Sequence, residues 1–99
     1  MEKNNQIQLD TLTAKQYIAF PWSYSDDDNQ RIKVTRVTSN FPKRQRLLVH
    51  FLYGCKSISE HIPYSEVIAV GNPHGGGKLP GWAGGFDILN KEHPLLKEN

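Results

Sequence analysis

Basic residues are concentrated in the middle of this 99-residue chain. Seven Lys or Arg side chains and no Asp or Glu lie between Asn29 and Ser59, namely Arg31, Lys33, Arg36, Lys43, Arg44, Arg46 and Lys56. An acidic run, Asp26–Asp28, directly precedes them, so the formal net charge of +2 hides a basic middle between more acidic ends. A positive field of this kind attracts polyanions and raises association rates, whereas it says little about the fold.

Nucleic-acid contact is the first chemistry that this pattern supports. The cations could track a phosphate backbone while an aromatic side chain just before them stacks on bases. The expected nucleic-acid-binding residues are Trp22, Tyr24, Arg31, Lys33, Arg36, Lys43, Arg44 and Arg46. The alternative is a solvated strand face whose cations offset the Asp26–Asp28 run, and charge runs are usually of that kind. Both interpretations stay open, and the uninterrupted basic stretch makes nucleic acid the leading hypothesis.

A glycine-rich segment invites comparison with a phosphate-binding loop. It runs from Gly71 to Gly77 and is followed by Lys78. The P-loop pattern G-x-x-x-x-G-K-[ST] does not match, because the residue five before Gly77 is Asn72 and Lys78 is followed by Leu79. Pro80 would also block the helix whose N-terminus holds the phosphate. We therefore expect a flexible surface loop over residues 71–85.

Histidine, cysteine and glutamate do not combine into a metal or catalytic pattern. The four histidines are His50, His61, His74 and His93, and no pair has ligand spacing on a helix. Cys55 has a neighbouring cation, Lys56, but no acid that would orient a histidine base for it is identifiable. Glu60 and Glu66 give no reason to act as an acid and base pair. The sequence predicts no enzyme, no cofactor and no metal site.

Composition limits the class of protein. Hydrophobic residues make up 37% of the chain, which predicts a thin core for one domain. The single cysteine excludes an internal disulfide framework and fits a reducing compartment. No secretory signal and no run of eighteen apolar residues are present. We expect a soluble, cytoplasmic protein without membrane contact.

We expect residues 1–6 to form a polar tail and residues 7–90 to form the single domain. Alternation of polar and apolar residues predicts the first strands. A strand is expected over Gln16 to Trp22, with a short helix from Thr13 as the alternative. Arg31 to Ser39 alternates cations with Ile32 and Val34, and a shift in parity predicts a bulge near Thr35 or Arg36. A turn from Asn40 to Lys43 would make a hairpin with the next strand.

Arg46 to Gly54 has the strongest strand pattern in the chain. One face of it holds Leu47, Val49, Phe51 and Tyr53, which we assign to the core. The other face holds Leu48, His50 and Leu52, which predicts an interface covered by the C-terminal segment or by a second subunit.

The remaining elements are expected to be short. Ile58 to Pro63 predicts a strand, Tyr64 to Val67 one helical turn, and Ile68 to Val70 a further strand. Trp82 and Phe86 are expected to pin the glycine-rich loop, and residues 84–89 could add an edge strand. Residues 91–99 are expected to be loose.

The segment from Leu48 to Ile68 resembles the second half of Tudor-like and PWWP-like small barrels, and Phe20-Pro21-Trp22 resembles a Pro-Trp signature. The resemblance covers about half of the chain. It implies a strongly bent, five-stranded barrel that binds nucleic acid or protein tails, and in some members an aromatic cage for a methylated cation. The residues that would form this cage here are Trp22, Tyr24 and Tyr53.

The sequence therefore predicts a mainly β fold, a small bent five-stranded barrel-like domain with a glycine-rich C-terminal loop. The leading function is a non-catalytic binding module that contacts DNA or RNA through the basic hairpin between Arg31 and Arg46. The alternative is a protein-interaction or self-associating module that uses Leu48, Leu52 and the glycine-rich loop.

Overall fold

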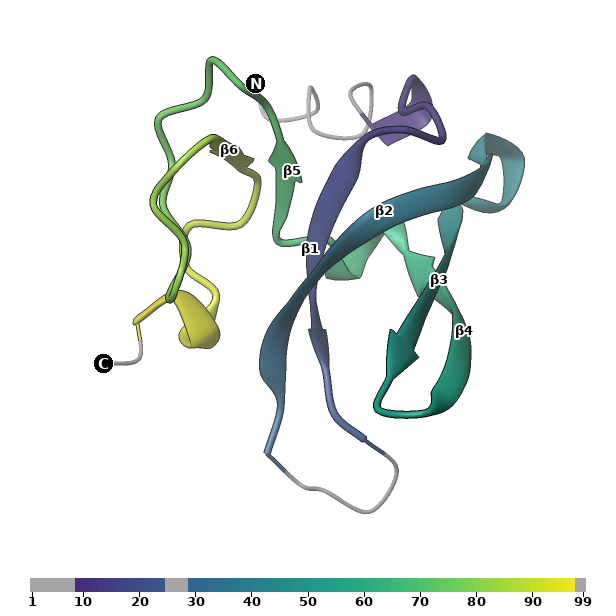
Figure 1. Ribbon diagram of the computed structural model, residues 1–99. Coiled ribbons are helices and arrows are strands. Elements are labelled where there is room, and N and C mark those ends of the chain that lie inside the picture. The colour runs from purple at the N-terminus through teal and green to yellow at the C-terminus, as the bar shows by residue number, and fades with distance from the viewer. Residues whose placement is uncertain (1–8, 25–28, 98–99) are drawn as a thin grey trace.

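The computed structural model describes residues 9–24 and 29–97, and they form a mainly β structure (Figure 1). One antiparallel sheet of six strands has the order β4-β3-β2-β1-β5-β6. The strands are β1 (Tyr17–Trp22), β2 (Arg31–Phe41), β3 (Arg46–Tyr53), β4 (Lys56–Pro63), β5 (Ala69–Gly71) and β6 (Phe86–Ile88). Short 3-10 helices are η1 (Pro42–Arg44), η2 (Tyr64–Glu66) and η3 (Pro94–Lys97). The expected mainly β class is confirmed.

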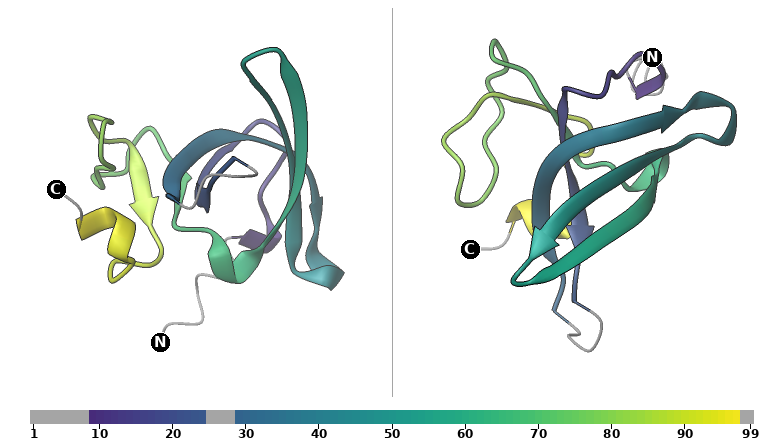
Figure 2. Two further views of the ribbon diagram at one scale, coloured as in Figure 1. Left: turned by 90° about the horizontal axis from the view of Figure 1, so that it is seen from below. Right: turned by 45° about the vertical axis from the view of Figure 1, so that its right-hand side comes forward.

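Strand β2 is the longest element and joins the two parts of the sheet. Residues 31–36 pair with β1, and residues from Val37 to Phe41 pair with β3. The register shifts between Val37 and Ser39, so Thr38 is the extra residue. The expected bulge therefore lies slightly later than Thr35 or Arg36, at the point where β2 changes partner. Figure 2 shows the resulting curvature of β2.

Strands β3 and β4 form the most regular hairpin. Every residue of β3 pairs with β4, from Arg46 with Pro63 to Tyr53 with Lys56. Only Gly54 and Cys55 connect the strands, and Gly54 adopts a φ of 63°, which favours glycine. The turn is tighter than expected, so β4 begins at Lys56 and not at Ile58.

Neighbouring residues of a strand point to opposite sides of the sheet, and β1 contributes core residues on both sides. Ile18 and Phe20 of β1 belong to a cluster that we call the major cluster. Its buried members are Leu9, Leu12, Ile18, Phe20, Val37, Leu47, Val49, Phe51, Ile62, Tyr64, Val67 and Val70. Ala19 points the other way, into the minor cluster. That cluster contains Ala19, Ile68, Ala69, Leu79 and Phe86, with Ile32, Val34, Ile88, Leu95 and Leu96 packed against it.

The sheet differs from the expected five-stranded barrel in two ways. It has six strands, because the edge strand that residues 84–89 could add is present as β6, on the outer edge of β5. It is also open, since β4 and β6 are its two edges and do not pair with each other in the part that the structure describes. The three-residue length of β5 and of β6 leaves too little ladder to close the sheet.

The C-terminal third is more ordered than expected. Residues 72–85 contain no helix or strand, but Gly77 makes an isolated bridge with Phe86. Leu79 is 3% exposed and holds the loop on the minor cluster together with Phe86, whereas Trp82 is 50% exposed. The end of the chain was expected to be loose, yet η3 packs Leu95 and Leu96 against the minor cluster. The two adjacent leucines explain this contact, because both are apolar and gain from burial. The predicted tail, residues 1–6, and the acidic run Asp26–Asp28 lie outside the described residues.

Two absences hold for residues 9–24 and 29–97. No helix there has the length and apolar character needed to cross a membrane. No group of three or more His, Cys, Asp or Glu side chains is placed to hold a metal ion.

Candidate functional site

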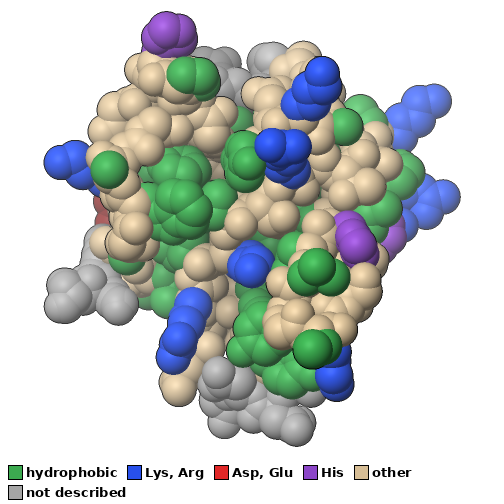
Figure 3. Space-filling model, viewed as in Figure 1, with side chains coloured by type: hydrophobic (Ala, Val, Ile, Leu, Met, Phe, Trp, Pro, Cys, Tyr) green, Lys and Arg blue, Asp and Glu red, His purple; other side chains and the backbone are tan. Residues whose placement is uncertain are grey.

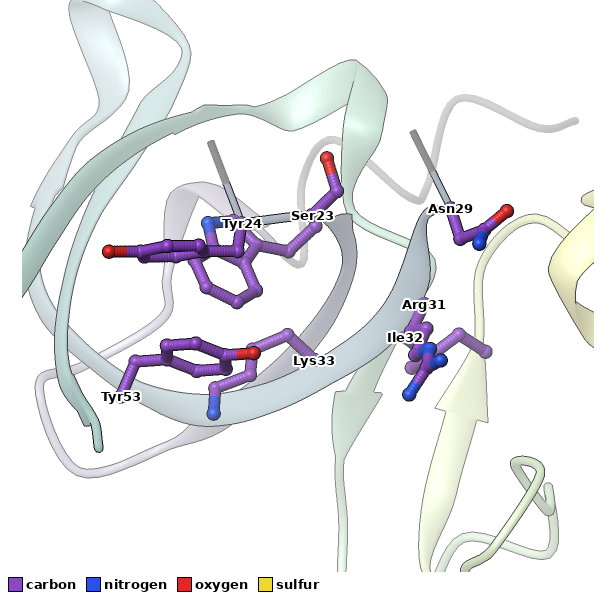
Figure 4. Close-up of a pocket in the computed structure, with 8 residues that line it drawn as sticks. Ser23, Tyr24, Asn29, Arg31, Ile32, Lys33 and Tyr53 are labelled. Carbon is purple, nitrogen blue, oxygen red and sulfur yellow. The ribbon is translucent and has the colours of Figure 1, made fainter. Parts of the chain in front are cut away.

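Three aromatic side chains meet at one end of the sheet (Figure 4). Trp22 ends β1, Tyr24 follows it, and Tyr53 ends β3. The ring centroids of Tyr24 and Tyr53 are 4.8 Å apart at an interplanar angle of 21°, so these rings are stacked. Trp22 meets Tyr53 edge-on at 5.1 Å and Tyr24 at 6.2 Å. We call Trp22, Tyr24 and Tyr53 the aromatic cluster.

The aromatic cluster is anchored on the rim of the major cluster. Trp22 shares the face of β1 that carries Ile18 and Phe20, and it packs against the major cluster. Its ring meets buried Phe51 at 5.1 Å and 88°, an edge-to-face contact. Tyr53 lies on the same face of β3 as Phe51, but it is the last residue of the strand and lies at the edge of the major cluster. Tyr53 was expected in the core and is 44% exposed.

Three cations lie close to the aromatic cluster. The Lys33 ammonium lies 4.4 Å from the ring centroid of Phe51, and the Lys56 ammonium lies 5.7 Å from that of Tyr24. Hydrogen bonding to Tyr24 raises the pKa of Lys56 above its usual value. Arg31 is directly opposite Trp22 in the pairing of β1 with β2. All three side chains are therefore positioned to meet an anion beside the rings.

A hollow of about 180 Å³ lies beside the aromatic cluster. Within residues 9–24 and 29–97 its lining includes no carboxylate and consists of Trp22, Ser23, Tyr24, Asn29, Arg31, Ile32, Lys33 and Tyr53 (Figure 4). The volume is below the roughly 300 Å³ that encloses a drug-sized ligand. The hollow suits one group of a larger ligand, such as a phosphate or a sugar, while the rings offer their exposed faces.

The predicted cage residues do come together, but not as an empty cage. Stacking of Tyr24 on Tyr53 fills the space between their faces, where a methylated ammonium would need to lie. The described charges nearest to the rings belong to Lys33 and Lys56 and would repel a cation. The arrangement therefore favours an anionic ligand over a cationic one.

The other predicted basic residues lie elsewhere. Arg36, in the middle of β2, donates from Nε to the Tyr17 hydroxyl at 3.0 Å. Lys43 and Arg44 are exposed on η1, beyond the far end of β2. Arg46 is half-buried, and its buried Nε has no hydrogen-bond partner among the described residues. Eleven residues of strand span about 33 Å, so the basic hairpin is not one continuous patch.

Lys56 is the site residue that the sequence prediction left out. It was counted among the basic residues, but it was expected to lie before the strand from Ile58 to Pro63. The two-residue turn instead makes Lys56 the direct cross-strand partner of Tyr53. Glycine directly after an aromatic strand end was the available signal, because a glycine can start a turn of this kind.

The predicted interface residues of β3 do not form a continuous apolar surface. Leu52 is 68% exposed, whereas Leu48 is half-buried. His50 lies between them, exposed, and its Nε2 is 2.9 Å from the Ser57 hydroxyl. The cross-strand partners of these residues on β4 are Ser57, Ser59 and His61. The C-terminal segment packs on the minor cluster and leaves Leu52 uncovered.

Comparisons with protein-family models, with curated proteins and with solved structures found no match.

Proposed function

We propose that this protein is a non-catalytic binding module that contacts nucleic acid through the aromatic cluster and the cations around it. One observation carries the proposal: partly exposed, stacked aromatic rings lie beside a hollow whose described lining residues include Arg31 and Lys33 and no carboxylate. Flat hydrophobic faces beside positive charge are what a base and its phosphate require together.

Stacking and charge would have separate roles. A base that stacks on an exposed ring of the cluster gains about 1–3 kcal/mol, whatever its sequence. Arg31, Lys33 and Lys56 would neutralise phosphates, and each released counterion makes binding weaker at higher salt. Such binding should be weakly selective for sequence and strongly dependent on salt.

The resemblance to Tudor-like and PWWP-like barrels is part of the proposal. Two observations support it: β1 pairs with both β2 and β5, and the single turn η2 precedes β5. Within that resemblance, the stacked tyrosines and the surrounding cations favour the nucleic-acid-binding members over those that hold a methylated cation. The alternative of a protein-interaction module using Leu48 and Leu52 remains a prediction, and the exposure of Leu52 is what favours it.

The test compares two charge reversals at opposite ends of β2. One variant carries Arg31→Glu and Lys56→Glu beside the aromatic cluster, and the other carries Lys43→Glu and Arg44→Glu on η1. All four side chains are exposed, and both variants change the net charge equally. Binding to labelled single-stranded and double-stranded oligonucleotides would be measured by fluorescence anisotropy at several salt concentrations.

We expect the first variant to lose at least tenfold in affinity and to lower the slope of log K against log salt by about 1–2. The second variant should retain most of the affinity. Equal losses in the two variants would mean that net charge alone drives binding. No binding by the unaltered protein at low salt would exclude the proposed function.

A further inference from the structure

A second hollow lies at the other end of β1, between this strand and the glycine-rich loop. Its volume is about 560 Å³, and we call it the loop groove. Its lining is largely apolar and consists of Lys15, Gln16, Tyr17, Val34, Gly71, Asn72, Pro73, Trp82, Gly84, Gly85 and Phe86. Figure 3 shows an apolar patch at this place, between the loop and the central strands. The glycine-rich loop was part of the alternative interaction module, but none of the individual site residues named from the sequence lines this groove.

Two aromatic side chains in the loop groove are available to a ligand. Tyr17 is 42% exposed and Trp82 is 50% exposed. The ring of Trp82 packs edge-on against that of buried Phe86, with ring centroids 6.1 Å apart and an interplanar angle of 83°. Tyr17 is held by Arg36, whose guanidinium lies 5.2 Å from the ring centroid. Both rings are therefore anchored while one part of each stays open to solvent.

Two glycines leave one wall of the loop groove without side chains. Gly84 and Gly85 have φ values of 138° and 90°, a backbone conformation that L side chains rarely adopt. Without side chains there, a planar ligand can approach the backbone beside Trp82.

The charge around the loop groove matches that of the aromatic cluster. Lys15 is among the lining residues, and Arg36 binds the Tyr17 hydroxyl. No carboxylate is among its described lining residues. The nearby Asp87 carboxylate accepts a hydrogen bond from the Asn72 amide at 2.8 Å. Both hollows thus combine exposed rings with cations, which favours the same anionic, aromatic ligand.

The two sites are joined along one pair of strands. Tyr17 and Trp22 are the first and last residues of β1, about 17 Å apart by strand rise, and their side chains leave the strand on opposite sides. A ligand can pass from one to the other over β2, because residues 31–36 of β2 pair with β1 and not with β3. The cross-strand partners of Tyr17 and Trp22 on β2 are Arg36 and Arg31, with Lys33 between them opposite Phe20. Figure 3 shows apolar patches beside the loop and near the end of β3 on the same face, with Lys and Arg side chains over β2 between them.

We propose that one single-stranded nucleic acid follows β1 and β2 and uses both sites, with one base on the aromatic cluster and another on Tyr17 and Trp82 in the loop groove. The cations of β2 would contact the phosphates between them. This inference rests on the proposed function and extends it. A single strand is required because paired bases cannot present their faces to rings at two separate sites.

The test measures affinity against oligonucleotide length. Labelled oligothymidylates of about four, eight and twelve nucleotides cover the usual range of site sizes for such modules. Tyr53→Ala removes one site, Trp82→Ala removes the other, and Trp82→Phe restores a ring. Phe41→Ala is the matched control, since Phe41 is an exposed aromatic residue outside both sites. Thermal unfolding of each variant checks that the fold is retained.

We expect each of the two alanine variants to weaken binding of the longest strand by about tenfold. The shortest strand should lose no more than a few-fold in either variant, because it can use the remaining site. Trp82→Phe should recover most of the loss, and Phe41→Ala should cause none.

Other results would overturn the inference in distinguishable ways. If Trp82→Ala changes binding at no length while Tyr53→Ala weakens it, the continuous path is wrong and the proposed function stands. If Trp82→Ala weakens all lengths equally, the strand does not bridge the sites. If a proline-rich peptide alters Trp82 fluorescence and no oligonucleotide does, the loop groove serves a protein partner. If the unaltered protein binds no oligonucleotide, both proposals fail.

Discussion

The major and minor clusters cover opposite faces of the same sheet, yet they are built by different means. The major cluster lies mainly among β1 to β4, which have 6 to 11 residues and pair along their length apart from the bulge at Thr38. The minor cluster is framed by β5 and β6, of three residues each, and by the glycine-rich loop and η3. Long strand pairing surrounds the first, whereas the second combines short strand pairing with close backbone packing of the glycine-rich loop.

The glycine-rich loop shows how close this packing is. A Cβ atom placed on Gly75 would lie 2.7 Å from the carbonyl carbon and oxygen of Phe86, and one on Gly77 would lie 2.6 Å from Ile88 Cγ1. Real Cβ atoms do not approach backbone atoms so closely. The loop can therefore lie against β6 only where side chains are missing, and order in this half of the molecule depends on particular glycines.

The largest effect on stability should come from replacing a buried leucine of each cluster by alanine. Leu47 is fully buried between paired strands, and Leu79 is 3% exposed on the loop. We expect Leu47→Ala to lower the free energy of unfolding by about 4 kcal/mol and Leu79→Ala by about 2 kcal/mol, because the loop can move into the space whereas paired strands cannot. Urea denaturation measures both.

Local probes can sharpen the same prediction. Trp22 packs on the major cluster and Trp82 on Phe86 of the minor cluster, so single-tryptophan variants report the two halves separately. With Leu79→Ala, the Trp82 signal should change at lower urea than the Trp22 signal. Coincident transitions and equal losses of stability would mean that the two clusters form one cooperative unit.

A smaller effect should separate two neighbouring glycines. Gly75→Ala places a Cβ against Phe86, whereas a Cβ on Gly76 would meet nothing within 4 Å. We expect Gly75→Ala to cost about 1–3 kcal/mol. Gly76→Ala should stay within about 0.5 kcal/mol of the unaltered protein or stabilise it slightly, since it restricts the unfolded chain. Differential scanning calorimetry can compare them, and equal melting temperatures would contradict the close packing.

The elements whose residues alternate between polar and apolar could be predicted from the sequence. β1, β2, β3, η2 and β5 lie within one or two residues of their expected ranges, because one face of each strand is apolar and period two is easily detected. The burial of Leu47, Val49 and Phe51 in the core is also as expected. The end of β2 was missed because Asn40 and Phe41 resemble a turn, although the Asn40 amide binds the carbonyl oxygens of Leu9 and Leu12.

The other parts of the fold could not be predicted in the same way. Burial of Leu79 and the packing of Leu95 and Leu96 depend on contacts between segments far apart in the sequence and carry no period. The same limit applies to the candidate site. Trp22, Tyr24 and Tyr53 could be named as a group only through a resemblance, and the separation of Lys43 and Arg44 from Arg31 required the length of β2.

The smallest predicted effect concerns a titratable group that only the major cluster contains. Tyr64 is a buried member of that cluster, and its hydroxyl donates a hydrogen bond to Asn40 Oδ1. Burial raises the pKa of Tyr64 above its ordinary value of 10.0, and the negative charge of Asp10 adds to the shift. The minor cluster consists of Ala, Ile, Leu and Phe side chains, which do not titrate.

The sign of the pH dependence follows from this shift. A folded-state pKa above the unfolded one means that the neutral phenol stabilises the fold below about pH 10, and that this contribution is lost as the pH rises past that value. We expect urea midpoints to fall with pH above about 10, with the Trp22 signal leading the Trp82 signal. Tyr64→Phe should lower stability at neutral pH by about 1 kcal/mol through the lost hydrogen bond and should flatten the alkaline decline. An alkaline decline of the same slope in that variant would show that other groups cause it, and a leading Trp82 signal would place the alkaline weakness in the minor cluster.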